Sequence, residues 1–100
     1  GGEQQMLAIA RAMIRNAELI MLDEPFEGLA PIIVRDLIEV CRQLATAGHT
    51  IIIVEQNVRA ALSLADRCYV LNNGHMVYEG AAADLHANTA IIAKYLGVQI

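Results

Sequence analysis

Apolar and polar residues along the chain follow two different patterns: a helical spacing and short continuous apolar runs. Over residues 3–15, apolar side chains recur at the spacing of one helix face, at Met6, Ile9, Ala10 and Met13. This stripe predicts a helix over Glu3–Arg15. Similar stripes predict a helix over Ile32–Thr46 and a shorter helix over Val58–Ala65.

Short runs of almost continuous apolar residues separate these helices. Leu19–Leu22 and Thr50–Val54 have the length and the aliphatic composition of strands that are buried on both faces. Two further strands are predicted at Cys68–Leu71 and Met76–Glu79. The residues between them include Asn-Gly, which accepts the positive φ values of a tight hairpin turn.

The end of the chain, Ala81–Leu96, predicts one or two short helices with a break near Asn88. Helices and strands therefore alternate through most of the sequence. This order predicts an α/β fold with a mostly parallel sheet, flanking helices and a terminal β-hairpin.

The composition is unusually apolar for 100 residues. Hydrophobic residues make up 56% and charged residues only 18%, whereas about 25% charged residues are typical. Such a sequence excludes intrinsic disorder. Because a small domain has a large surface for its volume, the composition indicates a subunit with buried interfaces or a piece of a larger domain. We expect such a piece, folded alone, to expose an apolar face and to associate.

The sequence disfavours a membrane span and a nucleic-acid partner. No run of consecutive apolar residues approaches the roughly 18 that a membrane span needs. The net charge is −4 and the single lysine is Lys94. A nucleic-acid partner is therefore not expected, because phosphate binding needs a basic face.

Polar residues follow both predicted aliphatic strands. Asp23-Glu24 follows the first, and Glu55-Gln56-Asn57 follows the second. The carboxyl ends of parallel strands meet at one sheet edge, where ligands bind in open α/β sheets. Asp23 is suited to Mg²⁺, which binds one or two carboxylates together with substrate phosphates. Glu24 would point the other way if the pleat continues, and is suited to orient or deprotonate a water. The alternative is a strand that ends in an acidic turn.

A glycine pair, Gly1-Gly2, leads into the first helix. Glycines allow the backbone to approach a ligand, and a helix N-terminus offers free N–H groups to an anion. For the pair alone, a helix entry loop or a cloning scar is the simpler interpretation.

Together, these residues resemble the ATP-binding subunit of an ABC transporter over essentially the whole chain. Gly1–Gln5 resembles the end of the LSGGQ signature, and Leu19–Glu24 resembles the Walker B strand. The D-loop would follow at Phe26–Pro31, and the closing strands would lie around Ala65–Arg67 and Asn73-Gly74. The resemblance implies the C-terminal part of a P-loop NTPase, an ABC-type nucleotide-binding domain. Residues 1–100 contain no GxxxxGK[ST], so the P-loop half is expected to be absent and this chain alone to be inactive.

A narrower resemblance points to importers of branched-chain amino acids. It is carried by Glu27–Pro31, Val54–Asn57 and Lys94–Gly97. Three positions depart from the wider family pattern: Glu3 replaces a common Gln, Ala30 replaces the D-loop Asp, and Gln56 replaces the switch histidine.

The resemblance implies ATP and Mg²⁺ as cofactors. Asp23 would hold the metal, Glu24 would orient the attacking water, and Gln56 would sense the γ-phosphate. Gly1, Gly2 and Glu3 would contact the ATP of an opposite subunit.

The implied partners are a second ATP-binding subunit, which gives a homodimer or heterodimer, and transmembrane permease subunits. A substrate-binding protein would act indirectly, and the location would be peripheral, on the cytoplasmic face of the bacterial inner membrane. Two alternatives stay open: an ATPase for urea, another polar solute or lipopolysaccharide export, and a non-catalytic dimerisation module.

Overall fold

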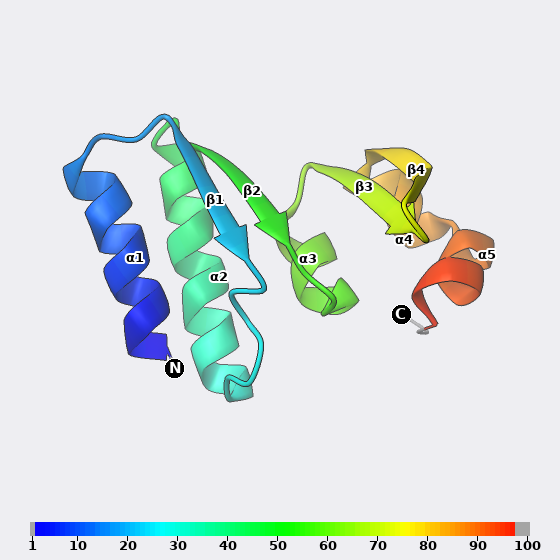
Figure 1. Cartoon of the computed structure of the whole chain (residues 1–100), viewed down its shortest axis with the longest axis horizontal. Helices are drawn as coiled ribbons and strands as arrows, with labels where there is room; N and C mark the ends of the chain where they lie inside the picture. Colours follow the sequence, from blue (N-terminus) through cyan, green and yellow to red (C-terminus); the bar gives the residue numbers. More distant parts are fainter. Residues whose placement is uncertain (1, 98–100) are drawn as a thin grey trace.

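The structure, a computed structural model, describes residues 2–97, apart from the side chains of residues 5 and 12–14. Helices and strands alternate in the predicted order (Figure 1). The helices are α1 (Gly2–Ile14), α2 (Pro31–Thr46), α3 (Val58–Leu64), α4 (Ala82–Ala87), α5 (Thr89–Ile91) and a last π-helical turn, Ile92–Leu96. The strands are β1 (Leu19–Asp23), β2 (Thr50–Val54), β3 (Arg67–Asn72) and β4 (His75–Ala81). The α/β class is therefore confirmed.

The parallel pair of β1 and β2 forms the centre of the first part of the molecule. Ile20 lies opposite Ile51 and Leu22 lies opposite Ile53. These residues face a core to which α1, α2 and α3 all contribute (Figure 1). The fully buried members of that core are Ile9, Ile20, Leu22, Phe26, Leu37, Cys41, Leu44 and Ala60.

Helix α2 follows its predicted stripe closely. Leu37, Cys41 and Leu44 are buried, one helical turn apart. The helix begins at Pro31 after an extended Ala30, because proline fits the first turn, where its missing N–H would have no partner. The stripe predicted for the first helix is confirmed only in part, since Ile9 is 2% exposed but Met6 is 42% exposed.

Within the described residues the two aliphatic strands are covered on one face only, and the open face is the apolar surface expected of a piece of a larger domain. Along β1, buried Ile20 and Leu22 alternate with Met21, which is 70% exposed. The reason is that the described helices pack on the same face of the pair, which leaves the other face open. We call its apolar residues the open sheet face: Leu19, Met21, Ile52 and Val54.

The second part of the molecule is the predicted hairpin with its covering helices. Asn73 and Gly74 connect β3 to β4 with φ values of 50° and 78°, as the Asn-Gly signal predicts. Val70, Leu85 and Ile92 form a separate small core. The hairpin is a sheet of its own: in the described part of the chain, β3 pairs with β4, and neither is hydrogen-bonded to β1 or β2. The predicted terminal hairpin is therefore present, as a separate sheet.

The terminal helices break at Asn88, as predicted, where the Asn88 side chain accepts a hydrogen bond from the backbone N–H of Ile91. Over residues 2–97, no helix combines the length and the apolar character that crossing a bilayer requires.

Candidate active site

The carboxyl ends of β1 and β2 meet, as the sequence predicts. Asp23 lies opposite Val54, and the backbone N–H of Glu24 donates to the Val54 carbonyl at 2.7 Å. The polar residues after the two strands line one open hollow of about 350 Å³. Its lining residues are Glu24, Phe26, Glu27, Gly28, Glu55, Gln56 and Asn57.

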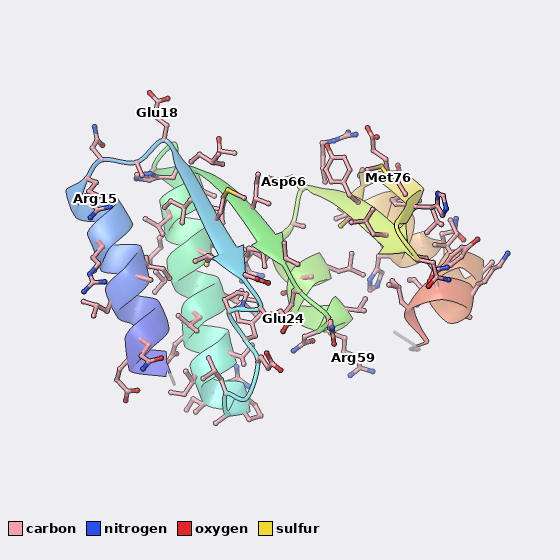
Figure 2. All side chains as sticks on the ribbon, in the orientation of Figure 1. Arg15, Glu18, Glu24, Arg59, Asp66 and Met76 are labelled. Carbon is pink, nitrogen blue, oxygen red and sulfur yellow. The ribbon has the colours of Figure 1, made fainter. Side chains whose placement is uncertain are left out.

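Glu24 does not continue the pleat of β1, so the condition on which it would point away from Asp23 is not met. Its φ is +47°, in the left-handed region that residues other than glycine adopt rarely. The strand ends at Asp23, which is exposed on the same side as the open sheet face. Glu24 is half-buried and lies at the far end of β1 from Glu18 (Figure 2). The turn at Glu24, rather than strand alternation, directs this carboxyl group toward the hollow.

The surroundings of Glu24 favour its protonated form. Its pKa is raised, chiefly because its carboxyl group is hydrogen-bonded to that of Glu27 and because the charge of Glu27 repels a second negative charge. Partial burial and the charges of Asp23 and Glu55 act in the same direction. A carboxyl group with a raised pKa is a stronger base when it is ionised, which suits general-base chemistry.

Glu55 connects the loops that follow the two strands. One carboxylate oxygen accepts from the backbone N–H of Phe26 at 3.1 Å. The other accepts from the backbone N–H groups of Gln56 and Asn57, at 3.0 Å and 3.1 Å. Sequence reasoning placed Glu55 at the sheet edge but missed this role, because the Phe26 partner lies 29 residues away.

Gln56 is exposed and lines the hollow, and Asn57 is the N-cap of α3. The Asn57 side-chain oxygen accepts from the backbone N–H of Ala60 at 3.2 Å, as an N-cap does. This cap fixes where α3 starts and therefore where the three-residue loop carrying Gln56 ends.

The residues at the start of the chain, Gly1, Gly2 and Glu3, are predicted to contact the nucleotide of an opposite subunit. Gly1 lies outside the described residues, and Gly2 is the first residue of α1. Glu3 is exposed in the first turn and does not line the hollow. A carboxylate there is favourable beside the positive end of the helix dipole. The roles of Gly1, Gly2 and Glu3 toward a nucleotide stay predictions.

The residues at the sheet edge fit a magnesium ion that is shared with phosphates. Within residues 2–97, no group of three or more His, Cys, Asp or Glu side chains is arranged to hold a metal by itself. Mg²⁺ commonly uses only one or two carboxylates and takes its other ligands from water and substrate phosphates. The exposed carboxylate of Asp23 meets that requirement.

Comparisons with known proteins agree with this fold. The ABC transporter family model matches residues 1–27. The high-affinity branched-chain amino acid transport ATP-binding protein BraG of Pseudomonas aeruginosa is 50% identical over 97% of this chain and 42% of its own length. The lipopolysaccharide export system ATP-binding protein LptB of Escherichia coli is 35% identical over 97% of this chain and 40% of its own. The chain thus spans about two fifths of the length of these curated relatives.

A solved structure extends the agreement to three dimensions. A nucleotide-free ATP-binding cassette from an ABC transporter matches 99% of this chain and 40% of its own length, with a TM-score of 0.84 and 27% identity. By sequence and by fold, the chain is similar to ABC transporter ATP-binding proteins.

Proposed function

We propose that the whole protein hydrolyses ATP to drive an ABC importer of branched-chain amino acids. The observation that carries the catalytic part is the meeting of Glu24 and Gln56, from the ends of two paired strands, in one hollow. ATP hydrolysis transfers a phosphoryl group to water. This reaction needs a carboxyl group that orients the water and an amide that senses the phosphate.

Each residue has a proposed task. Glu24 orients the attacking water and takes up its proton. Gln56 donates an amide hydrogen bond to the γ-phosphate; unlike a histidine it has no titrating proton near neutral pH. Asp23 would hold Mg²⁺, which when bound neutralises charge on the phosphate oxygens. A P-loop elsewhere in the whole protein would hold the other phosphates, and Gly1, Gly2 and Glu3 would contact the nucleotide of a second ATP-binding subunit.

The proposed partners follow from the family. A transporter ATP-binding subunit acts on transmembrane permease subunits, so the whole protein would lie peripherally at the cytoplasmic face of the membrane. ATP binding would close a dimer of ATP-binding subunits and hydrolysis would reopen it, and a substrate-binding protein would deliver the amino acid to the permeases.

Branched-chain amino acids are proposed as the cargo because of the chain's similarity to named relatives. The named branched-chain relative is more similar to this chain than the lipopolysaccharide export relative. The segments Glu27–Pro31 and Val54–Asn57, which flank the hollow, carry the narrower resemblance to branched-chain amino acid importers.

Uptake measurements in the source cells test this proposal. Deleting the gene should abolish high-affinity uptake of labelled leucine, isoleucine and valine, and leave uptake of a basic amino acid unchanged. The wild-type gene should restore uptake, whereas Glu24→Gln should not. Normal uptake of all three amino acids in the deletion strain, together with a defect in lipopolysaccharide export, would replace the cargo assignment with the export function.

A further inference from the structure

The side chain of Glu55 is hydrogen-bonded to both loops of the candidate site. Its Oε2 accepts from the backbone N–H of Phe26, in the loop after β1. Its Oε1 accepts from the backbone N–H groups of Gln56 and Asn57, in the loop after β2. Hydrogen bonds to a carboxylate are shorter and stronger than those between neutral groups. One half-buried side chain therefore links the loop of Glu24 to the loop of Gln56.

The loop after β1 needs such a link. Glu24 is in the left-handed region, and a residue stays in such a conformation only when the surrounding structure holds it there. On one side, the Glu24 backbone N–H is bonded to the Val54 carbonyl. Two residues later, the backbone N–H of Phe26 is bonded to Glu55.

The side chain of Phe26 supplies a third anchor. It is 3% exposed and packs in the core under the parallel strands. The short segment from Glu24 to Phe26 is thus held by a strand carbonyl, a core aromatic ring and the Glu55 carboxylate. Only the last of these also contacts the loop that carries Gln56.

We infer that Glu55 is a positioning residue, which keeps Glu24 and Gln56 in register across the hollow by bonding the backbone of both loops. This inference rests on the proposed function, because the register matters only if both side chains act on one nucleotide. Small displacements of reacting groups cost rate more than affinity. Loss of the link should therefore lower kcat for ATP hydrolysis and leave KM for ATP nearly unchanged.

Two substitutions separate the link from the local loop. An aspartate side chain is shorter by one carbon–carbon bond, about 1.5 Å. Aspartate readily accepts hydrogen bonds from backbone N–H groups one or two residues on. Glu55→Asp should therefore keep the bonds to Gln56 and Asn57 and lose the bond to Phe26, whereas Glu55→Ala loses all of them.

The test is steady-state ATP hydrolysis by the whole protein. We expect Glu55→Asp to lower kcat at least tenfold with KM for ATP within about threefold, which is the size of loss that misplacing a reacting group produces. Hydrogen exchange should become faster at the Phe26 amide. Glu18→Asp makes the same chemical change at an exposed glutamate at the other end of β1 and should behave as wild type (Figure 2).

Wild-type kcat in Glu55→Asp would overturn the inference, because it would show that the local bonds alone suffice. A fall in melting temperature that accounts for the lost activity would also overturn it, as a purely structural role. If Glu55→Ala does not fold, Glu55→Asp still decides. Glu24→Gln keeps the two proposals apart: full turnover in that variant removes the proposed function, whereas lost turnover in Glu24→Gln with normal Glu55→Asp removes only the positioning role.

Discussion

The carboxyl group of Glu27 is the largest cause of the raised pKa of Glu24, through hydrogen bonding and through charge repulsion. At neutral pH, folding brings the negative charges of Glu24 and Glu27 close to those of Asp23 and Glu55. In the unfolded chain they separate. The raised pKa means that the folded state binds the Glu24 proton more tightly than the unfolded state does. The stability that Glu24 contributes therefore falls as the pH rises from the ordinary pKa of 4.5 to the raised pKa of the folded state.

Removing the charge of Glu27 should therefore stabilise the nucleotide-free and magnesium-free protein. We expect Glu27→Gln to raise the melting temperature slightly at pH 7–8. The gain should shrink as the pH falls and Glu24 takes up a proton, because the repulsion between the two carboxylates is then lost. Thermal unfolding across this pH range measures the effect, with Glu18→Gln as a control at an exposed glutamate. A lower melting temperature of Glu27→Gln at pH 8 would show that the hydrogen bond outweighs the repulsion.

Helix α2 shows what periodicity can predict for an element. Its buried stripe follows directly from the spacing of apolar residues, because one face of an amphipathic helix packs on the core. The strands were harder to predict. A run of four aliphatic residues has the same sequence whether one face or both faces are covered, so the exposure of Met21 depends on where the helices pack.

The same helix offers a matched pair of substitutions. Leu37→Ala, at a position that is 1% exposed, should destabilise the chain by about 2–5 kcal/mol, because it leaves a cavity in the core. Ile32→Ala, at a position on α2 that is 64% exposed, should change stability by less than about 0.5 kcal/mol. Urea unfolding measures both. If both variants lost the same free energy of unfolding, the face of α2 that carries Leu37 would not be the one that packs on the core.

Over the described part of the molecule, the apolar composition has a structural counterpart in the open sheet face. Leu19, Met21, Ile52 and Val54 are each at least 44% exposed and lie side by side on two paired strands. Contiguous exposed apolar surface of this kind marks a contact surface or an aggregation risk. The sequence predicted an apolar face of this kind, and the structure shows which residues form it.

This face should make residues 1–100, when purified alone, self-associate. Met21→Lys places a charge at the middle of the face and should shift the chain toward the monomer in sedimentation velocity. Ile32→Lys, on exposed α2 outside the face, should not. A wild-type chain that stays monomeric at high concentration would contradict this account of the open sheet face.

The candidate site was predictable only in part, for physical reasons. The polar strand ends could be read from sequence because parallel strands share an edge. The left-handed turn at Glu24 and the bond from Phe26 to Glu55 could not, since both depend on contacts between loops far apart in the chain.

The central claim is that Glu24 carries out the chemistry of ATP hydrolysis in the whole protein. The direct measurement compares ATP binding with steady-state turnover in the Glu24→Gln variant. Since general-base catalysis contributes about 10²–10⁴-fold, we predict at least a roughly 100-fold loss of kcat while ATP is still bound with near wild-type affinity. Glu18→Gln should behave as wild type in both assays. Unchanged turnover in Glu24→Gln would contradict the account.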